Sequence, residues 1–121
     1  MTVLPLPSRK TVKIILCHTP DFSRLKALSD EEQQRELSTF LAVIYATDFM
    51  APFDWMTEFA GKHDQLADLT VLDKADAAMV RKLLIANLRC DRFYTGHLEH
   101  LLRSGYLEAA LDRLRVLFAA L

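Results

Sequence analysis

The sequence predicts an all-α fold, a single compact domain of about five helices with an extended N-terminal arm. Apolar residues recur at helical spacing through much of the chain, capping residues precede several of these stretches, and only one short segment has strand character. The chain has 121 residues, and 51% of them are hydrophobic, which suits one domain with a substantial core.

The most regular pattern lies in the central part of the chain, residues 80–105. Five residues recur at the spacing of one helical face: Val80, Leu83, Leu84, Asn87 and Leu88. We expect a helix from about Lys74 to Cys90, with Asp73 as its N-cap and the Asp76 carboxylate in its first turn, where it favours the helix dipole.

Two further helices are expected after this one. The apolar pattern stops and then resumes beyond Thr95, whose hydroxyl can cap a short helix over about 96–104. Gly105 ends that helix, because glycine takes the left-handed conformation at little cost. A last helix opens at Tyr106 or Leu107, and its apolar residues again recur at helical spacing.

Capping residues also organise the middle of the chain. The run Ser29-Asp30-Glu31-Glu32 is a capping box and predicts a helix over about Asp30–Ala46. Asp54 can cap a further helix that carries Trp55. Residues 66–72 form a connector with room for a helical turn.

The first part of the chain, residues 1–28, is expected to be the extended arm, and residues 29–121 the helical domain. Val12–Cys17 is the one credible strand, because the pair Ile14-Ile15 is β-branched and Pro20 follows. A single strand lacks a partner within the chain. It would pair with a second chain, form an irregular edge, or be helical after all.

Charge and cysteine content exclude several classes of protein. The formal net charge is −1 at pH 7, so the chain lacks the uniform basic field that draws proteins to nucleic acid or membrane surfaces. Residues 1–80 carry a net charge of −4 and residues 81–121 a net charge of +3. Cys17 and Cys90 have no metal-type spacing, so two reduced, buried thiols in a cytoplasmic protein are expected.

Two segments resemble a known family: LSTFLAVIYATDFMAPFDW and VRKLLIANLRCDRFYTGHLEHLLRSGYLEAALDRLRVL. They are similar to small bacterial proteins classed as a domain of unknown function, in which an FDW segment precedes an RKLL…R-x-DRF-x-x-GHL run and a terminal L-x-RL-x-x-L helix. The resemblance spans roughly Glu36–Phe118. This sequence departs after FDW, where the family pattern has a proline and a second tryptophan and this chain has Met56 and Phe59. The resemblance implies the helical fold and leaves the activity of the protein open.

One cluster of residues is a candidate ligand site: Arg89, Asp91, Arg92, Thr95, Gly96 and His97. A helix that begins at Gly96 would offer free N–H groups and a positive dipole end to a phosphate or carboxylate, and an arginine would complete the cradle. His97 in the first turn would tend to be neutral and able to accept a proton. In the other interpretation Thr95 takes up the free donors, Asp91 pairs with an arginine, and the cluster only fixes the turn.

The FDW segment, Phe53, Asp54 and Trp55, is a candidate interaction surface. An exposed tryptophan there would be a binding anchor, as protein interfaces favour this residue at their hot spots. The alternative has Asp54 as a helix cap and both aromatic rings in the core.

No pattern of high specificity indicates catalysis. The chain lacks a Gly-x-Ser-x-Gly context and a glycine-rich phosphate loop, and His97 and His100 have no evident third metal ligand. We therefore expect a non-catalytic protein-binding or regulatory module, an inhibitor or accessory factor, with a protein partner or a second copy. The alternative is a small-ligand or enzymatic domain that recognises a phosphate or carboxylate at the Arg89–His97 cluster. No cofactor, metal, membrane or nucleic acid is expected.

Overall fold

The computed structural model describes residues 4–90 and 96–119, and every regular element in them is helical, which confirms the predicted all-α fold. The α-helices and the 3-10 helix (η1) of the described residues have these bounds: α1 Arg9–Cys17, α2 Phe22–Lys26, α3 Asp30–Tyr45, α4 Trp55–Glu58, η1 His63–Ala67, α5 Leu69–Asp73, α6 Ala77–Cys90, α7 His97–Ser104 and α8 Tyr106–Leu117.

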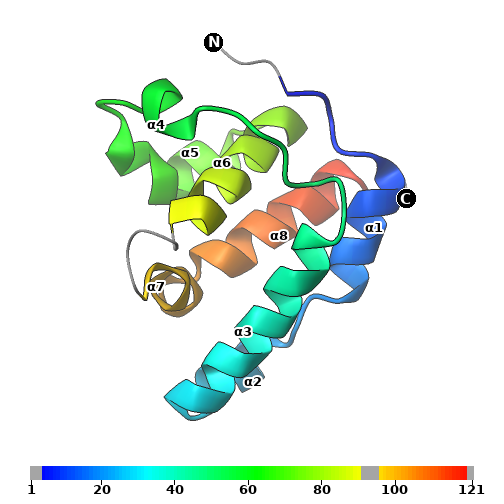
Figure 1. Cartoon of the computed structure of the whole chain (residues 1–121), viewed down its shortest axis with the longest axis vertical. Coiled ribbons are helices and arrows are strands. Elements are labelled where there is room, and N and C mark those ends of the chain that lie inside the picture. Colours follow the sequence, from blue (N-terminus) through cyan, green and yellow to red (C-terminus); the bar gives the residue numbers. More distant parts are fainter. Residues whose placement is uncertain (1–3, 91–95, 120–121) are drawn as a thin grey trace.

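The helices pack around α6, in which every residue from Val80 to Leu88 is buried. α6 contacts α4, η1, α7 and α8, and α8 in turn contacts α1, α5 and α7. Figure 1 shows α6 and α8 crossing the middle of the molecule, with α4 at the upper left and α1 at the right. The core lies between these two central helices and the elements around them, including the long helix α3.

Several predicted helix ends are confirmed, and each has a local cause. Ser29 Oγ accepts a hydrogen bond from the Glu32 backbone N–H at 3.3 Å, so α3 begins where the capping box predicts. α7 lies between Gly96 and Gly105, whose φ angles are +86° and +83°. A residue with a side chain is strained in this left-handed conformation, which explains why glycine separates α7 from α8.

The predicted helix from Lys74 to Cys90 is wrong at its start. α5 ends at Asp73 and α6 begins only at Ala77, with Asp76 rather than Asp73 as its cap: Asp76 Oδ1 accepts from the Met79 backbone N–H at 2.8 Å. The break leaves the carbonyl of Ala75 free of a helical partner, and Arg113 Nε of α8 donates to it at 3.0 Å. A contact with α8 therefore stabilises the break between α5 and α6.

The predicted strand Val12–Cys17 is also wrong, since these residues belong to α1. The Ser8 hydroxyl caps this helix by accepting from the Thr11 backbone N–H at 3.1 Å. Val12 and Ile15 are both buried in the core. Residues three apart share one face of a helix and opposite faces of a strand, so the core position of both side chains requires the helix.

The extended arm predicted for residues 1–28 holds only for residues 4–8 of its described part, because the helices α1 and α2 follow, with Asp21 capping α2. One cysteine expectation changes as well. Both thiols are free and Cys90 is buried, but Cys17 is exposed. It lies one turn after Lys13 on the outer face of α1, opposite the face that enters the core.

A buried arginine joins three distant parts of the chain. The Arg81 side chain, 4% exposed, donates from Nε to the Phe49 carbonyl at 2.9 Å, from Nη1 to the Pro5 carbonyl at 2.7 Å and from Nη2 to the Asp48 carbonyl at 2.6 Å. Its guanidinium also lies 5.7 Å from the centroid of the Phe49 ring. Burial lowers the pKa of Arg81 and the Asp48 carboxylate opposes that change, but arginine stays charged in proteins.

Replacing this arginine should be costly because three main-chain acceptors lose their donor together. We expect Arg81→Ala to lower the free energy of unfolding by about 3–5 kcal/mol, measured by urea denaturation followed by circular dichroism. Arg81→Lys should recover only part of this, since one ammonium group cannot reproduce the planar set of donors.

The matched control is Arg35→Ala, since the Arg35 side chain is exposed and, among the described residues, makes only an i,i+4 pair with Glu31 at 3.5 Å. This change should leave the free energy of unfolding nearly unchanged. A loss for Arg81→Ala no larger than that of the control would contradict the role given to Arg81.

Candidate functional site

Only half of the predicted Arg89–His97 cluster falls within the described part of the chain. Asp91, Arg92 and Thr95 lie outside the described residues. Arg89 lies in the last turn of α6 and is partly buried, and its Nε atom is buried without a hydrogen bond to any described residue. Gly96 is exposed at the start of α7 and is followed by His97.

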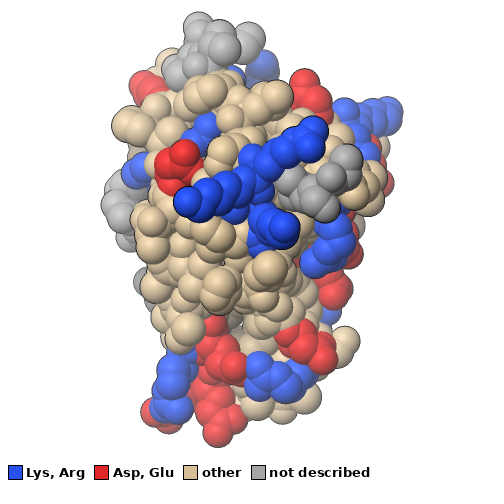
Figure 2. Space-filling view, turned by 90° about the vertical axis from the view of Figure 1, so that its right-hand side faces the viewer, with Lys and Arg blue, Asp and Glu red and all other residues tan. Residues whose placement is uncertain are grey.

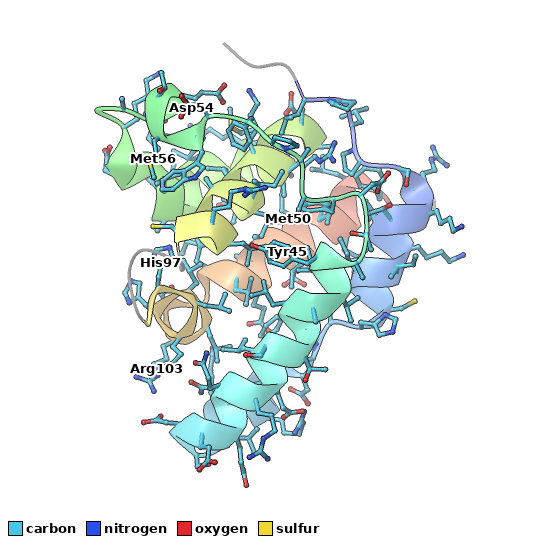
Figure 3. All side chains as sticks on the ribbon, in the orientation of Figure 1. Tyr45, Met50, Asp54, Met56, His97 and Arg103 are labelled. Atoms are coloured by element: carbon cyan, nitrogen blue, oxygen red, sulfur yellow. The ribbon has the colours of Figure 1, made fainter. Side chains whose placement is uncertain are left out.

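His97 is directed into the protein. Its Nε2 atom lies 3.0 Å from Oδ1 of Asn87, which is 1% exposed near the end of α6. Figure 3 shows His97 at the start of α7, on the side of that helix that faces α6. The ring therefore links the two helices across the turn between them.

The partners of Asn87 fix which nitrogen of His97 carries the proton. Asn87 Nδ2 donates to the carbonyls of Leu66 at 2.7 Å and Leu83 at 2.8 Å, so both N–H groups of the amide are used. Oδ1 can then only accept, and His97 Nε2 must be the donor. Asn87 thus joins η1, α6 and α7 through one side chain, a role that the sequence pattern did not indicate although it placed this residue on the core face.

Tyr106, the first residue of α8, borders the same polar centre. It is 2% exposed, and its hydroxyl makes no hydrogen bond of good geometry to a described residue. Burial raises the pKa of Tyr106 to about 12; the Asp68 carboxylate adds to the increase and the Asn87 amide acts against it. The phenol is therefore held neutral inside the fold.

The FDW segment lies mostly within the structure. Asp54 caps α4, accepting from the Thr57 backbone N–H at 3.2 Å and from the Thr57 hydroxyl at 2.6 Å, and these bonds lower the pKa of its carboxyl group. Trp55 is buried and Phe53 is partly buried against the core. Figure 3 shows Asp54 at the start of α4. Neither aromatic ring presents an exposed anchor to a partner.

A basic surface that the sequence pattern did not single out lies on α1. Arg9, Lys10 and Lys13 are exposed there, and none forms a salt bridge with a described residue. We call these three residues the α1 basic face. Figure 2 shows Lys and Arg side chains gathered on this side of the molecule, with much uncharged surface and one acidic side chain beside them. α1 also packs against α8, whose exposed Val116 and Leu117 add apolar area.

Residues 23–120 match a family described as "Family of unknown function (DUF6508)". The chain belongs to this family. The match confirms the predicted membership of a domain-of-unknown-function family, and α1 precedes the matched residues of this DUF6508 domain. No curated protein and no solved structure matches the chain.

Two searches of the described residues gave negative results. Over residues 4–90 and 96–119, no helix is long and apolar enough to cross a membrane. In the same ranges, no group of three His, Cys, Asp or Glu side chains could hold a metal ion.

Asn87 can be tested with an isosteric change. Asn87→Asp removes both N–H donors and turns a carboxylate oxygen toward the carbonyls of Leu66 and Leu83. We expect the free energy of unfolding at pH 7 to fall by about 3 kcal/mol, measured in urea. The control is Gln34→Glu, the same chemical change at an exposed position of α3, which should have little effect. Equal effects of the two changes would show that the Asn87 bonds are dispensable.

Tyr106 makes stability depend on pH in the alkaline range. Between about pH 10 and about pH 12 the unfolded chain releases the phenolic proton while the folded protein keeps it, so the free energy of unfolding falls as pH rises, by up to roughly 2–3 kcal/mol. Tyr106→Phe should resemble the wild type at pH 8 and lose less stability over this interval, as measured by urea denaturation. Parallel losses in both proteins would show that Tyr106 is not responsible.

Proposed function

We propose that this DUF6508 domain is a non-catalytic protein-binding module whose α1 basic face holds an acidic segment of a partner protein. The observation that carries the proposal is that Arg9, Lys10 and Lys13 are exposed together without an anionic partner among the described residues. A regulatory or accessory role in the cytoplasm, where Cys17 and Cys90 stay reduced, is part of this proposal.

This arrangement works against the stability of α1 itself. Arg9 and Lys13 are four residues apart and Lys10 and Lys13 three apart, so their like charges repel on the helix surface. Arg9 and Lys10 also lie in the first turn, where the helix dipole disfavours cations, and no acidic residue in that turn offsets them. A local conflict of this kind is relieved when an anionic partner binds, which supports a binding role.

The surface around the α1 basic face favours a protein partner over nucleic acid or an anionic membrane. Val116 is 64% exposed on α8, which packs against α1, and Leu117 is also exposed. Protein interfaces combine apolar contacts with charged pairs at their edge. The chain as a whole has a net charge of −1 and so has no general attraction to nucleic acid or an anionic membrane. We infer a partner segment that carries both acidic and apolar residues.

A second function, recognition of a phosphate or carboxylate at the Arg89–His97 cluster, is supported by one observation. The buried Nε of Arg89 has no hydrogen bond to a described residue. One observation opposes this second function. The His97 ring already makes a hydrogen bond with Asn87 inside the protein, which removes one expected ligand contact. The α1 basic face therefore has the stronger support.

The test uses a random peptide display library selected against the purified protein. We expect the bound peptides to be enriched in acidic residues interspersed with apolar ones, and their affinity to fall as salt rises. The double variant Lys10→Glu, Lys13→Glu should bind the selected peptides about tenfold or more weakly, measured by fluorescence anisotropy.

The matched control is Lys26→Glu with Lys74→Glu, the same charge reversal at two exposed lysines outside α1. It should keep the wild-type affinity. The proposal is wrong if the selected peptides are not acidic, if both double variants bind alike, or if duplex DNA or anionic vesicles bind more tightly than the peptides. A stable dimer that the α1 variant disrupts would identify a second copy as the partner.

A further inference from the structure

A cavity of about 360 Å³ lies where α4, η1 and α6 meet. The residues that matter for its chemistry are Glu58, Phe59, Lys62, Met79 and Lys82, all of which line it. Figure 1 shows α4 and α1 at opposite sides of the molecule, so this cavity is separate from the α1 basic face. Its volume is at the lower end of the range of ligand pockets, roughly 300–1,000 Å³, which limits it to a small molecule.

An ion pair of low exposure borders the cavity. Lys82 Nζ lies 2.8 Å from Glu58 Oε2, and the two side chains are only 10% and 14% exposed. The Lys82 ammonium also lies 5.9 Å from the centroid of the Phe53 ring. Desolvating two charges is costly unless their remaining hydrogen-bonding atoms are satisfied. The other carboxylate oxygen, Glu58 Oε1, is buried and has no hydrogen bond to a described residue.

That oxygen can serve a ligand without a change of fold. The terminal torsion of a glutamate side chain is broad, so a modest rotation can bring one carboxylate oxygen to the cavity that Glu58 already lines while the other stays within reach of the Lys82 ammonium. A carboxylate oxygen in this position accepts from an ammonium or another N–H donor, and charged hydrogen bonds of this kind are the strong ones. The Glu58 carboxylate therefore suits a ligand with a cationic donor at one end.

The cavity also contains an ammonium group, that of Lys62, which can bind an anion. Lys62 is exposed, lines the cavity and forms no salt bridge within residues 4–90 and 96–119. Because Glu58 and Lys82 pair with each other, the Lys62 ammonium is the remaining charged group in the cavity lining. Phe59 and Met79 supply the apolar walls. As far as the described residues show, the cavity thus combines a carboxylate oxygen without a hydrogen bond, an ammonium group without a salt bridge and an apolar surface.

We propose that this cavity binds a small zwitterion with an apolar side chain, of the class of the aliphatic and aromatic amino acids. The ligand's ammonium group donates to Glu58, its carboxylate pairs with Lys62, and its side chain packs against Phe59 and Met79. The proposal is independent of the protein-binding function and adds a small-molecule site to the domain.

The first experiment titrates the 15N-labelled protein with L-leucine, L-methionine and L-phenylalanine and follows the backbone signals by NMR. We expect saturable shifts centred on residues 57–62 and 79–82. Two analogues of leucine separate the two charged contacts: 4-methylpentanoate lacks the amine and 3-methylbutylamine lacks the carboxylate. Each should bind about tenfold or more weakly than leucine.

The variants leave the Glu58–Lys82 pair intact, because an unpaired buried charge would destabilise the fold. Lys62→Ala should weaken leucine binding about tenfold, and Met79→Trp should abolish it by filling the cavity. Lys74→Ala, a change of an exposed lysine outside the cavity lining, should bind like the wild type.

Three results would overturn the proposal: no saturable shift with any of the three amino acids at millimolar concentration, analogues that bind as well as leucine, or full affinity in Lys62→Ala. The Lys10→Glu, Lys13→Glu variant should bind leucine normally. Failure at the cavity and failure at the α1 basic face are therefore distinguishable.

Discussion

The fold depends on one buried guanidinium. Arg81 is charged and forms no salt bridge with a carboxylate of the described residues, so its buried guanidinium is held mainly by hydrogen bonds to the carbonyl groups of Pro5, Asp48 and Phe49. Those carbonyls come from the segment before α1 and from the connection between α3 and α4. The buried charge is satisfied only when both segments pack against α6. Their packing is therefore coupled, and the two segments belong to one folding unit.

Two more polar residues on α6 also connect this helix to other elements through polar contacts. Lys82 reaches Glu58 at the end of α4, and Asn87 reaches Leu66 in η1 and His97 in α7. Apolar residues bring α6 into the core, but apolar contacts tolerate small shifts along the helix. Hydrogen bonds do not, since their energy depends steeply on distance and angle. The polar residues therefore set the register in which the neighbouring elements dock.

Local signals and distant contacts explain what the sequence could and could not predict. The caps at Ser29 and Asp54 and the break at Gly105 act within one helical turn, and all three were predicted. The break before α6 is stabilised by Arg113 of α8 in addition to the local Asp76 cap, and the helical state of residues 12–17 depends on where the core lies. The partnership of Asn87 with His97 and the Glu58–Lys82 pair join residues far apart in sequence, so periodicity alone could not find them.

The way Arg81 is held has a consequence for how the surface of this domain can change. Its hydrogen bonds go to main-chain oxygens, which every amino acid supplies, rather than to particular side chains. The arginine thus fixes the path of two segments, and apart from the Phe49 ring and the Asp48 carboxylate it does not depend on the side chains that they display. Mutations in these segments can alter the exterior chemistry of the protein while the scaffold beneath keeps its shape.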